Sequence, residues 1–171
     1  GTSIANFKRE IDEKLKLEMD TLNQLTLGLK QDEFTIHLQP KMNMKTGKID
    51  SFEALSRWNS STLGSVPPSI FIPLAEQSGH IKKIDITVMR KALSWLEERI
   101  NKGLKIAPIA INISPDHFYD ELFLEKFKEV IKEYNVPLHL LKLELTEIIE
   151  LVDFTKAKEI INSNRDVVNT A

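Results

Sequence analysis

Apolar side chains form a stripe along the first part of the chain. They recur every three or four positions from residue 4 to residue 29: Ile4, Phe7, Ile11, Leu15, Met19, Leu22, Leu25 and Leu29. This spacing predicts an amphipathic helix with one apolar face. We assign residues 1–30 to an N-terminal linker helix. Its apolar face has two open interpretations: it packs on the body of the domain, or it pairs with an upstream domain or with its twin in a dimer.

Two strands are predicted after this helix. In residues 33–40, EFTIHLQP, apolar and polar side chains alternate, and Pro40 is expected to end the strand. Residues 45–48, KTGK, predict a turn into a second strand over 49–58. The following segment, 59–68, is rich in Ser, Gly and Pro, so we expect a loop there.

The rest of the chain alternates between helical and strand patterns. Its predicted elements are helices over 69–77 and 81–102, a strand over 105–114, a helix over 115–134, a strand over 140–149 and a helix over 154–162. Strands that alternate with helices are typical of a parallel sheet with right-handed crossovers. The predicted fold class is therefore α/β.

The composition narrows the class of protein. With 171 residues and 42% apolar content, the chain is long enough for one sizeable core, which is roughly one domain. The formal net charge of −2 argues against binding a nucleic-acid polymer. The chain has no cysteine, which excludes disulfides and thiol nucleophiles, and no apolar run approaches the ~18–20 residues of a membrane span. We expect a cytoplasmic domain, whose parent protein can still be anchored to a membrane upstream.

Three predicted strands carry polar side chains on a face where a plain core would have valine. The residues that share such a face are Glu53, Leu55 and Arg57 in the first strand, Ala110, Asn112 and Ser114 in the second, and Lys142, Glu144 and Thr146 in the third. Side chains in a parallel barrel alternate between the lumen and the helix layer. If these faces line one lumen, Glu53, Asn112 and Glu144 converge near the ends of the strands.

The chemistry of this set points to a divalent cation and a phosphate. Two carboxylates and an amide oxygen suit Mg²⁺, Mn²⁺ or Ca²⁺ rather than a soft metal. Arg57 adds a planar guanidinium that matches a phosphate group. The combination indicates metal-assisted phosphoryl chemistry. The alternative is that these acids pair with lysine and arginine inside a barrel.

Five short blocks of sequence, taken together, are specific to one family. They are Gln39-Pro40, residues 53–58 (EALSRW), residues 71–76 (FIPLAE) with Pro68 and Gly79, residues 112–114 (NIS) and residues 144–147 (ELTE). In this order and at these separations they resemble the motifs of the EAL domain, the cyclic di-GMP phosphodiesterase module of bacterial signalling. The blocks lie between residues 33 and 150, so the resemblance covers most of the chain.

This resemblance implies both a fold and a reaction. The fold is a modified TIM-type (β/α)8 barrel whose first strand runs antiparallel to the others, present here as a partial barrel preceded by the amphipathic helix. The reaction is the hydrolysis of cyclic di-GMP to linear pGpG with Mg²⁺ or Mn²⁺. Ca²⁺ in the same oxygen cage is expected to inhibit, because it tolerates looser geometry and is a weaker Lewis acid.

The resemblance also implies roles for individual residues. Glu53, Asn112 and Glu144 resemble the metal ligands of the family, and Glu53 is also predicted to be catalytic. Glu147 resembles a catalytic glutamate that orders a later loop of the barrel. The substrate-binding residues implied by the motifs are Gln39, Leu55 and Arg57.

The sequence departs from the family pattern after Glu147. The family continues into an aspartate-rich DDFG strand, a lysine-bearing strand and a late glutamate, whereas this chain has Asp153 and Asp166 without those motifs. We therefore interpret residues 31–171 as an EAL domain truncated before its DDFG-type strand. The chain alone is expected not to turn over cyclic di-GMP, because the aspartate ligands and the lysine near the attacking water are missing.

A partial barrel is expected to have an exposed edge. The apolar strand over 140–149 would then be unpaired, so we expect a homodimer or other self-association through this edge, the amphipathic helix or both. A GGDEF or sensor domain is expected upstream in the full-length protein. The alternative function is a non-catalytic module that binds cyclic di-GMP or dimerises in signalling.

Overall fold

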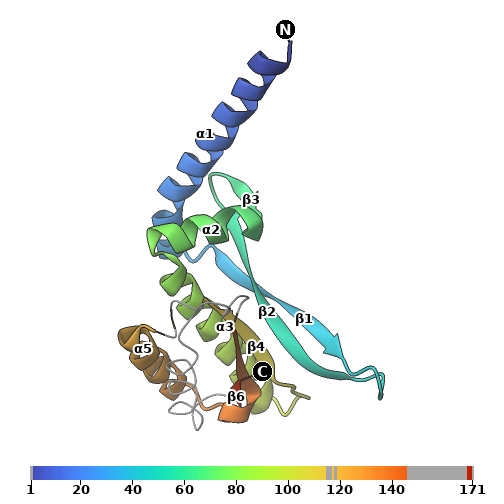
Figure 1. The fold of residues 1–171 in the computed structure, drawn as a ribbon. Coiled ribbons are helices and arrows are strands. Elements are labelled where there is room, and N and C mark those ends of the chain that lie inside the picture. Colours follow the sequence, from blue (N-terminus) through green and yellow to red (C-terminus); the bar gives the residue numbers. More distant parts are fainter. Residues whose placement is uncertain (1, 115–116, 118, 146–168, 171) are drawn as a thin grey trace. The chain divides into compact units, whose positions relative to one another are not determined.

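The computed structural model describes residues 2–114, 117, 119–145 and 169–170 (Figure 1). Its helices are α1 (Thr2–Lys30), α2 (Pro68–Ser78), α3 (Ile81–Asn101) and α5 (Glu121–Lys132), with a 3₁₀ turn, η1, at Leu138–Leu140. Its strands are β1 (Phe34–Met42), β2 (Ile49–Ser60), β3 (Gly64–Val66), β4 (Ile109–Ile113), β5 (Leu141–Leu145) and β6 (Asn169–Thr170). Within these ranges, no helix combines the length and the hydropathy that a membrane span requires.

The described strands form one sheet in the order β1-β2-β4-β5-β6, and β3 pairs with β2 outside this path. The pairs β2–β4, β4–β5 and β5–β6 are parallel. β1 and β2 are joined by the short turn 43–48, a connection too short for parallel pairing. Helices α2 and α3 lie in the connection from β2 to β4, and α5 lies in the connection from β4 to β5. This topology confirms the predicted α/β fold, a partial TIM-type barrel preceded by a helix.

Two strand boundaries depend on prolines in a way that the alternation pattern does not predict. β1 continues beyond Pro40, because β1 has one neighbour among the described strands and Pro40 can face away from it without losing a ladder bond. β4 begins at Ile109 rather than at residue 105, since it lies between β2 and β5 and Pro108 has no N–H to donate. The Pro108 carbonyl still accepts a hydrogen bond from β2 at 2.9 Å.

Two further boundaries differ from the prediction because of local pairing and capping. The segment 59–68 is not a plain loop, since β2 continues to Ser60 and pairs antiparallel with β3. Within the predicted helix over 115–134, α5 begins at Glu121 after the extended residue Asp120, and residues 115, 116 and 118 lie outside the described residues. The Asp120 carboxylate accepts hydrogen bonds from two backbone N–H groups of the first turn of α5, which is the geometry of a helix N-cap.

The last predicted strand is observed over Leu141–Leu145, and it is paired. β5 covers part of the predicted strand over 140–149, and residues 146–168, with the predicted helix over 154–162, lie outside the described residues. β6 pairs in parallel with β5 at Lys142 and Leu143. The prediction of an unpaired edge is therefore wrong at these positions, because another segment of the same chain lies along the strand.

The chain divides into two compact units, residues 1–35 with 57–84 and residues 36–56 with 85–171. The first unit contains α1, β3 and α2, and the second contains β4, β5, β6, α5 and most of α3. Each unit has buried apolar side chains of its own. In the second unit they come from both strands and helices: Met89, Leu93, Leu96, Ile109, Ile111, Phe127, Val130, Leu141 and Leu143.

Three aromatic rings form the centre of the first unit. Phe34 stacks on Trp58 with ring centroids 5.1 Å apart, and Phe71 meets them edge-on at 5.6 and 5.9 Å. All three side chains are buried. Helix α1 approaches this cluster closely at Gly28, where a Cβ atom would lie 2.9 Å from the Trp58 Nε1 atom. Glycine is therefore required at this position by the packing of the helix on the indole ring.

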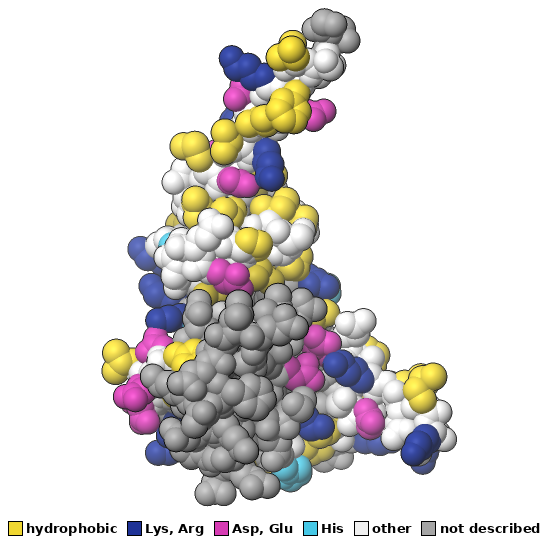
Figure 2. All heavy atoms as spheres, in the orientation of Figure 1, with side chains coloured by type: hydrophobic (Ala, Val, Ile, Leu, Met, Phe, Trp, Pro, Cys, Tyr) yellow, Lys and Arg dark blue, Asp and Glu magenta, His cyan; other side chains and the backbone are white. Residues whose placement is uncertain are grey.

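The predicted N-terminal helix is confirmed, and its apolar stripe has a buried part and an exposed part. Leu25 is fully buried within the first unit, whereas the side chains of Ile4 and Phe7 are 80% and 64% exposed. Figure 2 shows apolar side chains on the surface along the N-terminal part of α1. Packing on the unit accounts for the C-terminal part of the stripe. The interpretation as a pairing helix stays a prediction for the N-terminal part.

A buried acid and a buried imidazole contact each other in the second unit. Asp85 Oδ2, on α3, lies 2.7 Å from His117 Nδ1, and the two side chains are 11% and 1% exposed. The His117 ring also stacks on Phe123, with centroids 4.2 Å apart. Burial raises the pKa of the Asp85 carboxyl, and the contact with His117 opposes that rise. The pair ties α3 to the segment between β4 and α5.

Replacing Asp85 by alanine is expected to lower the free energy of unfolding by about 1–3 kcal/mol, because the buried His117 nitrogen would lose its partner. Asp85→Asn keeps an acceptor oxygen and removes the buried charge, so it is expected to cost less. Urea unfolding at neutral pH, followed by circular dichroism, measures both variants. Equal losses for the two variants would contradict a role for the contact with His117.

Candidate functional site

Strand register places three of the predicted site residues on one face of the sheet. Glu53 on β2 is opposite Ala110 on β4, and Asn112 on β4 is opposite Glu144 on β5. Side chains alternate along a strand, so Ala110 and Asn112 point to the same side. Glu53, Asn112 and Glu144 therefore share one face, across three adjacent parallel strands.

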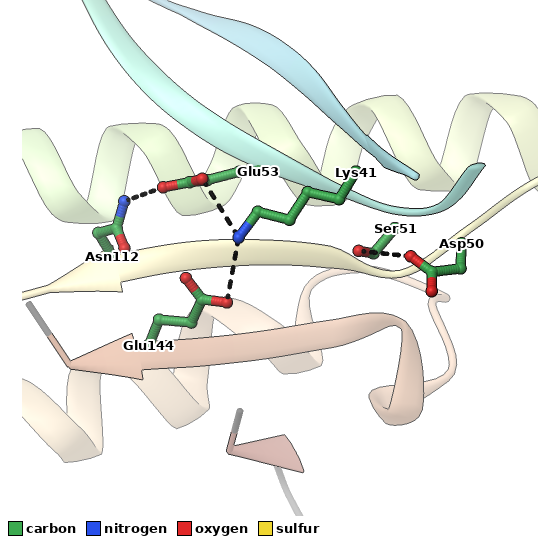
Figure 3. A network of polar contacts seen from close by, with 6 residues as sticks. All are labelled: Lys41, Asp50, Ser51, Glu53, Asn112 and Glu144. Atoms are coloured by element: carbon green, nitrogen blue, oxygen red, sulfur yellow. Dashed lines mark hydrogen bonds and ion pairs between the residues drawn. The ribbon is translucent and has the colours of Figure 1, made fainter. Parts of the chain in front are cut away.

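These three side chains are in contact, and a lysine joins them (Figure 3). The Asn112 Nδ2 atom donates a hydrogen bond to Glu53 Oε1 at 2.8 Å. Lys41, near the end of β1, places its Nζ atom 3.4 Å from Glu53 Oε2 and 3.8 Å from Glu144 Oε1. One ammonium group thus lies between two carboxylates that come from strands on either side of β4.

The sequence pattern does not single out Lys41. Its contact with the carboxylates depends on the β1–β2 hairpin and on the pairing of β2 with distant strands, which no local pattern encodes. The sequence does contain one signal: Lys41 lies two positions after Gln39 and therefore on the same face of its strand. The resemblance implies that Gln39 contacts the ligand, so the alternation of the strand would predict Lys41 beside the same pocket.

The surroundings of Glu53 favour its charged form. The hydrogen bond from Asn112 lowers the pKa of the Glu53 carboxyl most, and the Lys41 ammonium lowers it further, whereas partial burial works in the opposite direction. The side chains of Glu53 and Glu144 are 20% and 26% exposed, so both carboxylates still reach solvent. The lowered pKa gives a stability contribution that is present above the ordinary pKa of glutamate and is lost as the pH falls through the lowered value.

The donor set fits a hard divalent cation. Glu53 Oε2 and Glu144 Oε1 both face one positive charge, and carboxylate oxygens are the preferred ligands of Mg²⁺ and Mn²⁺. Asn112 uses its amide nitrogen toward Glu53, which leaves its amide oxygen as a further acceptor. Within the described ranges no group of three or more His, Asp or Glu side chains is clustered for a metal. The described part of the site therefore offers two carboxylates and one amide oxygen.

The alternative interpretation of these acids, pairing with a lysine, matches the ion pairs in the structure. It does not remove the metal interpretation, because the same two carboxylate oxygens that face an ammonium group can also face a metal ion. The choice between these two interpretations depends on whether the Lys41 ammonium or a metal ion binds the carboxylates more strongly.

The other predicted site residues are placed less completely. Gln39 lies exposed on β1, and Leu55 lies half-buried on β2, two positions after Glu53. Arg57 is half-buried on β2, in the stretch that belongs to the first unit. Glu147 lies outside the described residues. The structure thus brings together the three predicted metal ligands and leaves the roles of the other four residues as predictions.

The parallel sheet with helices in its crossovers places the chain in the class of α/β domains built as a partial TIM-type barrel. Comparison with known proteins then gives the family. The model of the EAL domain family matches residues 22–166. The chain belongs to the EAL domain family.

Relatives and solved structures of this family resemble the chain along most of its length. The chain is 29% identical to the cyclic di-GMP phosphodiesterase PA2567 of Pseudomonas aeruginosa, over 98% of this chain and 28% of the relative. It is 35% identical to the cyclic di-GMP phosphodiesterase PdeR of Escherichia coli, over 77% of this chain and 19% of that protein. A solved structure of the PaMucR phosphodiesterase in complex with c-di-GMP matches with a TM-score of 0.80 and 26% identity, over 88% of this chain and 62% of that one. The chain therefore spans less than a third of the length of the first two relatives.

Proposed function

We propose that this chain is part of a phosphodiesterase domain that hydrolyses cyclic di-GMP to linear pGpG with a divalent metal. The observation that carries the proposal is the convergence of Glu53, Asn112 and Glu144 on one face of a sheet in an EAL domain. Relatives named as cyclic di-GMP phosphodiesterases, and a solved relative in complex with c-di-GMP, support the choice of substrate.

In this proposal the chain's residues hold the metal and orient the substrate. Glu53, Glu144 and the amide oxygen of Asn112 would hold Mg²⁺ or Mn²⁺, and Ca²⁺ is expected to inhibit. The bound metal would polarise a phosphoryl oxygen and lower the pKa of water to near neutrality. Arg57 binds the substrate phosphate through its planar guanidinium. The remaining roles are substrate contacts for Gln39 and Leu55 and loop ordering for Glu147.

The complete domain is needed for turnover in this proposal. By the complete domain we mean residues 31–171 together with the later strands of the family, which carry its aspartate-rich and lysine-bearing motifs. Those motifs do not occur in the 171 residues of this chain. The chain by itself is therefore expected to supply part of the metal site and to show no turnover.

Calorimetry and product analysis test the proposed function. The 171-residue chain is titrated with cyclic di-GMP in the presence of Mg²⁺ and in its absence, and hydrolysis to pGpG by the chain and by the complete domain is followed by chromatography. We expect hydrolysis by the complete domain that requires Mg²⁺ or Mn²⁺. Binding of cyclic di-GMP without hydrolysis by the complete domain would instead support the alternative, a non-catalytic cyclic di-GMP module.

Self-association is a second part of the proposal, and it concerns the N-terminal helix. The exposed apolar side chains of α1, including Ile4 and Phe7, support pairing with a second copy or with an upstream GGDEF or sensor domain in a longer protein. Light scattering over micromolar concentrations tests pairing with a second copy. A mass equal to one chain throughout that range would exclude it.

A further inference from the structure

The ammonium group of Lys41 lies between the two carboxylates of the candidate site. Its Nζ atom is 3.4 Å from Glu53 Oε2 and 3.8 Å from Glu144 Oε1, and these are ion-pair distances to both predicted carboxylate ligands (Figure 3). The two carboxylates come from β2 and β5, which are separated in the sheet by β4. Lys41 therefore connects two acids that make no strand pairing with each other.

Electrostatics explains why a cation is needed here. Two carboxylates that face one point repel each other, and the repulsion is stronger where water is partly excluded. Both acids are more than two-thirds buried, at 20% and 26% exposure, so solvent screens them incompletely. Asn112 donates to Glu53 Oε1, which leaves Oε2 as the oxygen that faces the ammonium. One positive charge between the two acids offsets much of their repulsion.

A divalent ion bound by these carboxylates would need the same oxygen atoms. An ammonium group and a metal ion that share two ligand oxygens would lie within a few ångströms of each other, where their charges repel. Lys41 can leave the site, because it is on an outer strand of the described sheet and its side chain is 45% exposed. A lysine has a long, flexible stem that can turn its charge toward water.

We infer that Lys41 is a built-in counter-cation of this site, which a divalent metal must displace from Glu53 and Glu144 in order to bind. In this role Lys41 holds the two carboxylates together before metal binding and weakens the affinity for the metal. The inference deepens the proposed function, because the metal is the one proposed there, but its test needs neither substrate nor turnover.

Metal binding to Lys41 variants tests the inference directly. Free Mn²⁺ is measured by electron paramagnetic resonance in titrations of the 171-residue chain, as wild type and as Lys41→Gln. Lys41→Gln removes the ion pairs with Glu53 and Glu144 that the metal must break, so it is expected to tighten Mn²⁺ binding about tenfold. Lys41→Arg keeps the charge and is expected to bind Mn²⁺ with nearly the wild-type affinity.

Lys45→Gln is the matched control for net charge. Lys45 is an exposed lysine in the turn that follows β1, where its backbone N–H donates a hydrogen bond to the Asn43 side chain. If the two glutamine variants tighten Mn²⁺ binding equally, the effect is one of net charge and the inference is overturned. Weaker binding in Lys41→Gln, or no Mn²⁺ binding by either wild type or Lys41→Gln, would overturn it as well.

Thermal unfolding supplies a second readout. In EDTA, Lys41→Gln is expected to melt below Lys45→Gln, because Glu53 and Glu144 then face each other without a counter-cation. Saturating Mn²⁺ should raise the melting temperature of Lys41→Gln more than that of Lys45→Gln, since the metal replaces the lost charge. Equal shifts on adding Mn²⁺ would overturn the inference. If these results hold while the complete domain fails to hydrolyse cyclic di-GMP, only the proposed function fails.

Discussion

A Glu53→Ala variant of the complete domain is expected to hydrolyse cyclic di-GMP roughly 10²–10³-fold more slowly than the wild type. Glu53 is the carboxylate that the site holds most firmly, through the Asn112 amide and the Lys41 ammonium. Its pKa is lowered by these groups, so it is charged at neutral pH and can bind a metal ion. In the 171-residue chain, the same variant is expected to weaken Mn²⁺ binding by about tenfold or more.

Asp50→Asn is the matched control for this prediction. Asp50 is an acid on the same strand, β2, and it accepts a hydrogen bond from the Ser51 hydroxyl at 3.3 Å, away from the other acids (Figure 3). Its loss is expected to leave both the hydrolysis rate and the affinity for Mn²⁺ unchanged. If the Glu53→Ala domain bound cyclic di-GMP normally and hydrolysed it at the wild-type rate, the proposed metal site at Glu53 would be contradicted.

A Trp58→Ala variant is expected to lose about 3–5 kcal/mol of unfolding free energy, the largest effect on stability that we predict. Trp58 is 1% exposed, stacks on Phe34 and meets Phe71 edge-on. Truncation to alanine would leave a cavity on the side where α1 approaches the indole at Gly28. The surrounding helix and strand backbones limit how far the cavity can collapse, so most of the lost packing energy is not recovered.

The other tryptophan provides the control for Trp58. Trp95 lies half-buried in the second unit, with Phe52 edge-on at 5.8 Å and the Arg99 guanidinium 4.7 Å from its ring centroid. Trp95→Ala is therefore expected to cost less than Trp58→Ala. Urea unfolding monitored by circular dichroism measures both losses, since fluorescence would change with either substitution. If both variants lost the same unfolding free energy, the prediction would be contradicted. The buried aromatic cluster of the first unit would then not stabilise the protein more than the half-buried Trp95.

The helices and strands could be predicted well because their signals are local. The three-to-four spacing of α1 and the alternation in β1, β2 and β5 come from the geometry of a single helix or strand. Alternation by itself also predicts that Asn112 shares one face of its strand with Ala110, and that Glu144 shares one face of its strand with Lys142. The strand boundaries near Pro40 and Pro108 could not be predicted in this way, because the effect of a proline depends on how many strands lie beside it.

Sequence alone determined the α/β order of the chain, the family motifs and the residue types that could hold a cation. The tertiary structure decided which of these polar and charged side chains come into contact. The register of β2, β4 and β5 brings Glu53, Asn112 and Glu144 together, and β6 covers β5 from a distant part of the chain. The contact of Lys41 with both acids depends on a hairpin and two crossovers at once. The sequence pattern predicts which face of a strand each side chain occupies. Because these contacts join residues far apart in the sequence, only the assembled sheet places their charges side by side.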